Sequence, residues 1–277
     1  MNMIAVDELV RAALVEDCPY LDVTTEHMIE ESATATGVLA AKADGVLCGL
    51  EPALRAFTLL DDTVSIERLR ADGDRVQRGD VLARVSGWTR TLLKGERVAL
   101  NLLQHLSGIA TATAALVEQV ASTRAVISDT RKTLPGLRML QKYAVCCGGG
   151  RNHRFNLCDA AMLKDNHIDA GGGIGPAVAR LRGRLGHTVK IEVETRTLDE
   201  VRQALAAGAD IIMLDNMSPD LMRQAVALIG GRVPAEASGG IDADTIRAVA
   251  EAGVDIISVG ALTHSVTALD IHMRIEI

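Results

Sequence analysis

Hydrophobic positions in the first part of the chain follow both helical and strand-like spacings. The apolar residues of 4–14 recur at helical intervals, so they predict an amphipathic first helix. Residues 36–47 predict a strand, a turn and a second strand, and residues 72–85 predict a glycine-containing turn that leads into a strand. Leucines and a valine spaced over 92–106 predict a long helix. Residues 1–107 therefore predict an N-terminal α+β sandwich domain.

The rhythm changes from about Val126, where short aliphatic strands begin to alternate with helices. Residues 206–216 match residues 251–261 almost position for position, each with a helix end, a glycine and a short apolar strand. Such repeated units predict a parallel sheet. We therefore predict that residues 108–277 form a (β/α) barrel, an incomplete one, in an α/β protein. We expect a last helix over about 265–277 that packs back on the N-terminal domain.

Polar or glycine residues follow each predicted strand of the second domain, where the carboxyl ends of barrel strands form one mouth. Glycines after the last strands are typical of phosphate sites built from backbone N–H groups. Because Glu192 alternates with Glu194, we expect one of the two to point away from the mouth. The strand-end residues are Thr130, Arg131, Lys132, Lys164, Glu194, Asp215, Ser238, Gly239, Gly240, Gly260 and Ala261.

Charge is distributed unevenly along the chain. Lysines, arginines and histidines crowd residues 129–167, although the formal net charge of the whole protein is -7. A local cationic cluster on an acidic chain predicts a pocket for a small, multiply charged anion and argues against a broad nucleic-acid surface. The aromatic content of 2% also argues against a platform for stacking bases.

The cysteine pattern predicts reduced thiols. The chain has 5 cysteines and no Cys-x-x-Cys pair, which favours a cytoplasmic protein over a disulfide framework or a zinc site. We expect these cysteines to be small core residues. The first residues lack a basic start followed by an apolar run, and no apolar run is long enough for a span, so we expect neither a secretory signal nor a membrane association.

Several segments, taken in order over nearly the whole chain, resemble the quinolinate phosphoribosyltransferase family, also called nicotinate-nucleotide pyrophosphorylases (carboxylating). Any one of them could arise by chance, but the ordered set at compatible spacing is specific. The segments are residues 96–111, 130–138, 147–154, 163–168, 191–194, 213–217 and 236–241.

The resemblance implies phosphoribosyl transfer from phosphoribosyl pyrophosphate to quinolinate with decarboxylation. The products are nicotinate mononucleotide, pyrophosphate and carbon dioxide, in de novo NAD biosynthesis. Magnesium, Mg²⁺, accompanies the pyrophosphate. A pyridine dicarboxylate calls for planar, bidentate donors, and arginine supplies these better than lysine does.

The resemblance also implies roles for individual residues. Quinolinate would meet Arg131 and Arg154 with His153 and Lys164, and Arg97 would enter from the neighbouring subunit of a homodimer. Lys132 would contact the phosphoribosyl donor, with Thr130 also in the substrate site. Glu194 and Asp215 would stabilise the ribose cation and help to bind Mg²⁺, so Lys132, Glu194 and Asp215 form the catalytic set. The residues that would cradle the 5′-phosphate are Ser238, Gly239, Gly240, Gly260 and Ala261.

Some positions depart from the family pattern, and other functions stay open. Asn156, Cys158, Cys18 and Tyr20 stand where other residues are usual and bear on local loop geometry. The nearest alternative is the pyrophosphorylase-like paralogue associated with molybdate transport, which shares the Thr-Arg-Lys segment. A Schiff-base aldolase would use Lys164 as its nucleophile. A non-catalytic sensor of a phosphorylated metabolite would need the glycine segment but not the catalytic set.

Overall fold

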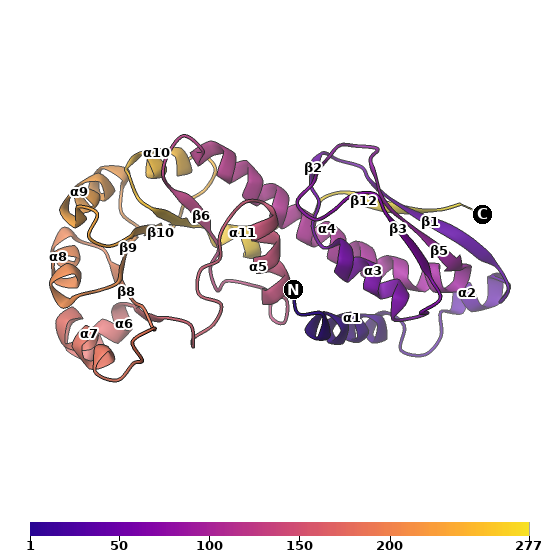
Figure 1. Cartoon of the computed structure of the whole chain (residues 1–277), viewed down its shortest axis with the longest axis horizontal. Helices are drawn as coiled ribbons and strands as arrows, with labels where there is room; N and C mark the ends of the chain where they lie inside the picture. Colours follow the sequence, from indigo (N-terminus) through magenta and orange to yellow (C-terminus); the bar gives the residue numbers. More distant parts are fainter. Residues whose placement is uncertain (277) are drawn as a thin grey trace. The chain divides into compact units, whose positions relative to one another are not determined.

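The computed structural model describes residues 1–276, which form two compact units (Figure 1). The first unit contains residues 1–114, 134–148 and the segment from 265 onward. The second contains residues 115–133 and 149–264. The chain therefore leaves the first unit and returns to it twice, and each unit is described by itself below.

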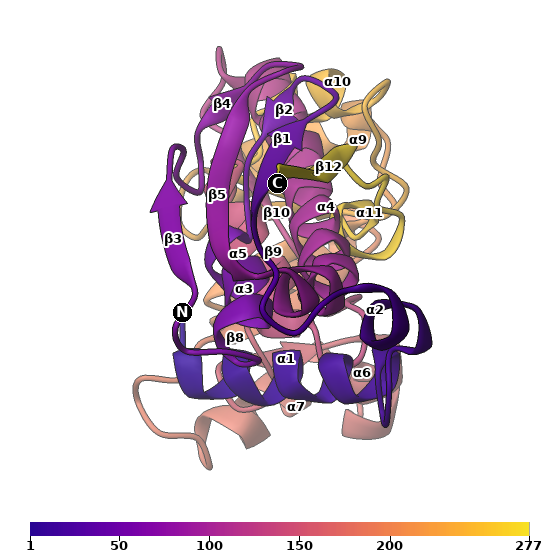
Figure 2. The ribbon, with the colours of Figure 1, turned by 90° about the vertical axis from the view of Figure 1, so that its right-hand side faces the viewer.

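The first unit is built on a four-stranded antiparallel sheet in the order β12-β1-β5-β3, whose strands β3, β5 and β1 run side by side in Figure 2. A short pair, β2 with β4, lies outside this sheet. The strands are β1 (Thr34–Ala41), β2 (Gly45–Val46), β3 (Ser65–Arg68), β4 (Arg75–Val76), β5 (Val81–Trp88) and β12 (Ile271–Glu276).

Helices accompany this sheet, and α3 packs closely on α4. Phe57 of α3 is completely buried, and a Cβ atom on Gly95 of α4 would lie 2.6 Å from its ring, so only glycine permits this approach. The mixed α+β character predicted for the first part of the chain is confirmed. The helices are α1 (Met3–Asp17), α2 (Val23–Met28), α3 (Leu50–Thr58), α4 (Thr89–Val120) and α5 (Arg138–Cys147).

The predicted terminal helix is wrong, because residues 271–276 form strand β12 and pair antiparallel with β1. Ile271 and Met273 are buried and His272 is only half-buried, which is the two-residue period of a strand. The expectation that this segment returns to the N-terminal part of the chain is confirmed by the same pairing. Backbone hydrogen bonds to β1 therefore decide the conformation here.

Helix α4 is long and apolar enough, by length and composition alone, to cross a membrane. However, 56% of its most apolar stretch is buried within the protein. A largely buried helix of this kind is typical of a protein core, where other side chains take the place of lipid.

The second unit contains a six-stranded parallel sheet in the order β6-β11-β10-β9-β8-β7. Strands β6 and β7 are its two edges, so the barrel is not closed, and the predicted incomplete (β/α) barrel is confirmed. The strands are β6 (Val126–Ser128), β7 (Ala161–Leu163), β8 (Ile191–Thr195), β9 (Ile211–Asp215), β10 (Ala235–Ser238) and β11 (Ile256–Ser258).

Helices connect these strands, and Figure 1 shows α7 to α10 outside the curved sheet. Thr197 and Glu200 form a capping box at the start of α8, and Gly208 ends that helix with a φ of 78°. Because Gly208 ends α8, the chain can enter strand β9 at Ile211. This helix–glycine–strand order is the one that the internal repeat predicts. The helices are α6 (Asp165–Gly171), α7 (Ile174–Arg182), α8 (Leu198–Ala207), α9 (Pro219–Ile229), α10 (Ile246–Glu251) and α11 (Ala261–His264).

Candidate active site

The carboxyl ends of the parallel strands surround a cavity of about 820 Å³. Every predicted site residue lines this cavity except Arg97, which is exposed on α4 in the first unit. The residues brought together are Thr130, Arg131, Lys132, His153, Arg154, Lys164, Glu194, Asp215, Ser238, Gly239, Gly240, Gly260 and Ala261.

One side of the cavity is cationic. Arg154 is anchored by a hydrogen bond from its Nη1 to the carbonyl oxygen of Ala160, at 2.9 Å. Its Nε is buried and has no hydrogen-bond partner among residues 1–276. Burial and the nearby charge of Arg131 lower the pKa of Arg154 from its usual value. Two guanidinium groups thus lie close together, which favours an anionic ligand that neutralises both.

His153 faces two buried carboxylates. Its Nε2 lies 3.1 Å from Oε2 of Glu192 and 3.3 Å from Oε1 of Glu236. Ser258 also donates a hydrogen bond to Glu236, while one oxygen of Glu192 is buried with no partner among the described residues. Glu192 and Glu236 are 1% and 2% exposed, so their charges depend on this contact rather than on water.

His153 and Glu192 hold protons more tightly than usual. Burial alone would lower the pKa of His153, but the hydrogen bonds to Glu192 and Glu236 outweigh it and raise the pKa to about 10. Burial also raises the pKa of Glu192. The Arg154 amide lies 2.6 Å from Nδ1 of His153, on the other side of the ring from the Nε2 that faces the carboxylates.

The buried Asp129 positions His153. Its Oδ1 accepts from the backbone N–H of His153 at 2.9 Å, and its Oδ2 accepts from the side-chain amide of Asn152 at 2.6 Å. Asp129 is completely buried and directly follows β6, so the strand end fixes the loop that carries His153 and Arg154.

Carboxylates line the cavity as well. Glu194 pairs with Lys164 at 3.0 Å, and Arg196 bridges Glu194 and Asp215 at 3.4 Å from each. Arg196 also pairs with Asp165 at 3.1 Å. Strands β8 and β9 are hydrogen-bonded neighbours, which is why their last acidic residues come together.

The carboxylates of Glu194 and Asp215 fit the requirements of magnesium. Magnesium in a phosphate-binding site needs only one or two protein carboxylates, because phosphate oxygens and water complete its coordination. Glu194 and Asp215 line the same cavity from adjacent strands and now share the positive charge of Arg196. A divalent cation could take over part of that charge compensation.

The segment after β10 has a backbone that requires glycine. Gly239 has a φ of 96°, and a Cβ atom there would lie 2.3 Å from the side-chain oxygen of Asn216. Asn216 itself has a positive φ of 53°, and its backbone N–H donates to the carbonyl oxygen of Ser238. Strained, tightly packed backbone of this kind is typical of a ligand site.

The loop that carries Lys132 is held at α11. The hydroxyl of Thr263 donates to the backbone carbonyl of Lys132 at 2.8 Å. A Cβ atom on Gly260 would lie 2.9 Å from the Lys132 side chain, so glycine leaves room for this lysine to cross the strand end. The loop after β6 and the start of α11 therefore form one part of the cavity wall.

The sequence interpretation missed several residues of this site. Glu194 lines the cavity and Glu192 contacts His153, which also lines it, so neither glutamate of β8 points away from the mouth and the expectation that one does is wrong. The two-residue period of the strand alone could have identified Glu192, but the position of Arg196 directly after the same strand gives no signal of its contacts. Glu236 and Asn216 lie inside recognised motifs, but no local signal indicates their contacts.

Comparisons with known proteins agree with this geometry. Residues 22–107 match the model of the quinolinate phosphoribosyl transferase N-terminal domain, and residues 109–274 match that of the C-terminal domain. The chain is 44% identical over 277 residues to a probable nicotinate-nucleotide pyrophosphorylase [carboxylating] of Bacillus subtilis, covering 100% of this chain and 96% of that protein.

Solved structures are equally similar. The crystal structure of NadC from Streptococcus pyogenes has 46% identity and a TM-score of 0.96, with 99% of this chain and 97% of that chain covered. The nicotinate-nucleotide pyrophosphorylase from Francisella tularensis has 40% identity and a TM-score of 0.96, with 100% and 98% covered. Nothing in these comparisons supports the molybdate-transport alternative. The chain belongs to the quinolinate phosphoribosyl transferase family.

Proposed function

We propose that the protein is a nicotinate-nucleotide pyrophosphorylase (carboxylating), which joins quinolinate to phosphoribosyl pyrophosphate in NAD biosynthesis. The observation that carries this proposal is the convergence of Arg131, Arg154 and Lys164 on one cavity that also contains Glu194 and Asp215. A cavity with cationic and acidic sides suits a dicarboxylate acceptor and a ribose that becomes positively charged.

The cationic side would bind quinolinate. The unpartnered Nε of Arg154 and the neighbouring Arg131 offer planar donors for carboxylate oxygens. His153 faces Glu192 and Glu236 through its Nε2, so this group positions the loop and sets the local charge. Binding of a dianion would relieve the repulsion between the two guanidinium groups.

The acidic side would serve the ribose. Departure of pyrophosphate leaves positive charge on the anomeric carbon, and Glu194 and Asp215 could stabilise it while the pyridine nitrogen attacks. Lys132 would contact the phosphoribosyl donor, and the backbone of Ser238, Gly239 and Gly240 would bind the 5′-phosphate. Magnesium held by Glu194 and Asp215 would compensate the charge of the pyrophosphate.

Decarboxylation then needs electrostatic help more than a dedicated base. The ring nitrogen becomes cationic when it bonds to ribose, and this charge stabilises the carbanion that remains when carbon dioxide leaves. A proton then occupies the vacated ring carbon. Arg131, Arg154 and Lys164 would hold the remaining carboxylate so that the ring stays oriented.

We also propose a cytoplasmic homodimer. The support is Arg97, which is exposed on α4 and outside the cavity lining, as expected for a residue that completes the site of a neighbouring subunit. The cysteine pattern, an odd number with no Cys-x-x-Cys pair, favours a reducing compartment.

Product analysis tests the proposed activity. The purified chain, incubated with quinolinate, phosphoribosyl pyrophosphate and Mg²⁺, should form nicotinate mononucleotide, pyrophosphate and carbon dioxide in equal amounts. Nicotinate in place of quinolinate should give no carbon dioxide. If quinolinate is not consumed, the proposal is wrong, and trapping of a carbonyl compound on Lys164 by borohydride would then favour an aldolase.

A further inference from the structure

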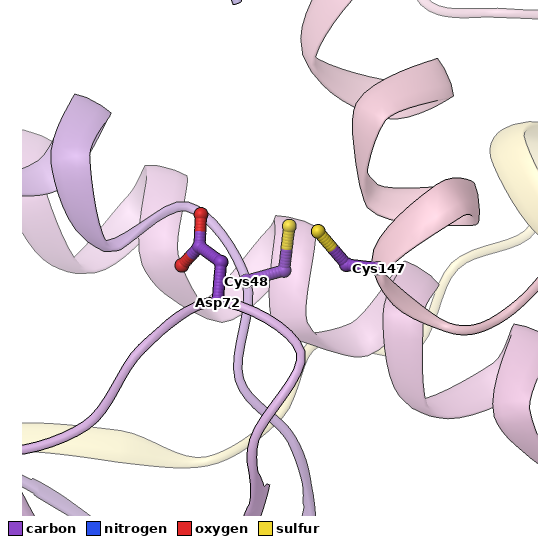
Figure 3. A group of neighbouring side chains, drawn as sticks. All are labelled: Cys48, Asp72 and Cys147. Atoms are coloured by element: carbon purple, nitrogen blue, oxygen red, sulfur yellow. The ribbon is translucent and has the colours of Figure 1, made fainter.

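A second group of reactive side chains lies in the first unit, within residues 1–114 and 134–148. Cys48, Asp72 and Cys147 come from three separate segments, and their sulfur and carboxylate atoms all lie within 4.8 Å of one another. Figure 3 shows the two sulfur atoms turned toward each other, with Cys48 between Asp72 and Cys147. None of the three lines the cavity described above.

Hydrogen bonds preorganise this thiol–carboxylate group. Oδ1 of Asp72 accepts from the backbone N–H of Leu50 at 3.0 Å, and Oδ2 accepts from the hydroxyl of Tyr143 at 3.0 Å. The sulfur atoms of Cys48 and Cys147 lie within 4.8 Å of each other and of this carboxylate. Asp72 therefore caps the start of α3 and is tied to α5, which holds its carboxylate beside the thiols.

One residue of the group is buried and the other two are partly exposed, so an ion could reach the group from solvent. Cys48 is completely buried, whereas Asp72 and Cys147 are half-buried and keep a route to solvent. Ordinary core packing explains a buried cysteine alone, but it does not explain a second sulfur and a carboxylate directed at the same point.

We propose that Cys48, Asp72 and Cys147 bind a divalent transition-metal ion of the zinc class, at a site separate from the active site. Two thiolate sulfurs and one carboxylate oxygen form a ligand set that zinc accepts and that magnesium does not favour. Water, or the Tyr143 hydroxyl that already touches Asp72, would supply the fourth ligand.

The site needs only a small contraction to hold the ion. Ligand atoms around tetrahedral zinc lie roughly 3.5 Å apart, since zinc–sulfur and zinc–oxygen bonds are about 2.3 and 2.1 Å long. The atoms here lie within 4.8 Å, so rotation of the half-buried Cys147 and Asp72 side chains would bring them into range. Binding replaces the thiol protons, so one Zn²⁺ enters and up to two protons leave.

The bound ion would act as a structural tie. It would join the segment before α3, the turn before β4 and the last residue of α5. Because an ion that binds only the folded chain stabilises it by mass action, Zn²⁺ should raise the melting temperature Tm of the whole protein.

Cobalt spectroscopy tests the proposal directly. The full chain, kept reduced with a phosphine and freed of metal by a chelator, is titrated with Co²⁺ and then with Zn²⁺. We expect a thiolate-to-cobalt charge-transfer band in the near ultraviolet, one ion per chain, and loss of the band when Zn²⁺ displaces Co²⁺. His153, Glu192 and Glu236 could also hold an ion, but without sulfur they give no such band.

Matched variants assign the band to residues. Cys147→Ser should abolish it, and Asp72→Asn, which keeps an acceptor for the Leu50 N–H, should weaken Co²⁺ affinity about tenfold or more. Cys146→Ser is the control, because Cys146 is the exposed neighbour of Cys147 and is not in the group. This control should keep the band and the rise in Tm with Zn²⁺.

Several outcomes would overturn the proposal. Absence of the band in the reduced wild-type chain would do so whatever the variants show, and so would a band that survives Cys147→Ser. If the reduced chain binds no cobalt and air converts Cys48 and Cys147 into a disulfide, the pair is a redox-active dithiol and not a metal site.

Discussion

At the scale of single residues, Arg154 offers the sharpest test of how the cavity binds its acceptor. Its Nε is buried without a partner among residues 1–276, so removal of the guanidinium group should affect a bound carboxylate more than the fold. A hydrogen bond to a charged group contributes about 1.5–3 kcal/mol. We expect Arg154→Lys to raise KM for quinolinate about tenfold or more, because lysine cannot make the planar bidentate contact.

Steady-state kinetics with each substrate in turn measure this effect. KM for phosphoribosyl pyrophosphate should change much less than KM for quinolinate. Arg151→Lys is the control, since Arg151 is exposed in the same loop and does not line the cavity. Equal losses for both substrates would show that Arg154 supports the loop and does not recognise the dicarboxylate.

His153 makes a prediction about pH. Its pKa is raised from an ordinary value of 6.5 to about 10 by Glu192 and Glu236, against the effect of burial. A raised folded-state pKa means that its contribution to stability is complete below pH 6.5 and is lost as pH rises toward 10. The free energy of unfolding of the wild-type chain should therefore fall over this range more steeply than that of His153→Gln.

Chemical denaturation at a series of pH values checks the difference between the two chains. Glu192→Gln removes one carboxylate partner and should move the His153 titration, followed by NMR, back toward its ordinary range. Parallel curves for the wild-type chain and His153→Gln would mean that His153 titrates alike in the folded and unfolded states.

Residue types and motifs predicted many of the residues that line the cavity. They did not predict the contacts between segments that are distant in the sequence. Arg131 and Lys164 could be named because charge, strand-end position and family motifs all indicated them, and Arg154 because charge and family motifs did. Arg196 could not, because a single arginine after a strand looks like a surface residue until Glu194 and Asp215 are known to flank it. Side-chain pairing of this kind depends on which strands are neighbours, and the local pattern does not encode that order.

At the scale of elements, the turn after β10 connects backbone strain to phosphate binding. A methyl group at Gly239 would meet the Asn216 side chain at 2.3 Å, and its φ of 96° is unfavourable for any other residue. We expect Gly239→Ala to move Asn216 and the proposed phosphate cradle. A shift of this size should raise KM for phosphoribosyl pyrophosphate about tenfold or more.

Gly240→Ala is a matched control in the same turn. Its φ of 61° is in the left-handed region, but a Cβ atom there would meet nothing within 4 Å. This variant should carry only the conformational cost of about 1–2 kcal/mol, with a much smaller change in KM. If both variants lose affinity equally, the turn is sensitive to strain alone and the contact with Asn216 does not matter.

The elements also show how far periodicity alone can predict structure. The glycine that ends α8 was predicted because helix stop signals are local. The segment 271–276 was misjudged as a helix, although its alternating Ile271, Met273 and Ile275 suit a strand. Six residues are too few for their hydrophobic pattern to distinguish a helix from a strand. The segment is a strand because it forms backbone hydrogen bonds with β1, which lies more than two hundred residues earlier in the chain.

At the scale of the whole molecule, the order of segments along the chain does not reveal which compact unit each segment belongs to. The compact units interleave, because residues 134–148 belong with the first unit while the segments on either side of them belong with the second. The local pattern of residues 138–147 does not say which unit buries helix α5. Fold class could therefore be predicted, whereas the membership of this helix required the structure.

The last prediction concerns the proposed dimer, in which Arg97 of one subunit would complete the site of its partner. Arg97 is exposed on α4 and is outside the cavity lining, whereas Lys132 lines the cavity. If the proposed dimer shares its sites, Arg97→Ala and Lys132→Ala should each inactivate the protein. A mixed dimer would then regain one site, since one subunit supplies Lys132 and its partner supplies Arg97.

Equal amounts of the two variants, unfolded and refolded together, should recover about one quarter of the wild-type turnover, since about half the dimers are mixed and each has one intact site of two. Affinity tags of two kinds would isolate the mixed dimers, where recovery should approach about half of the wild-type value. Co-refolding of Arg97→Ala with itself is the control and should recover nothing. Mixed dimers without activity would mean that Arg97 and Lys132 act within one chain, because no arrangement of two such subunits could then assemble an intact site.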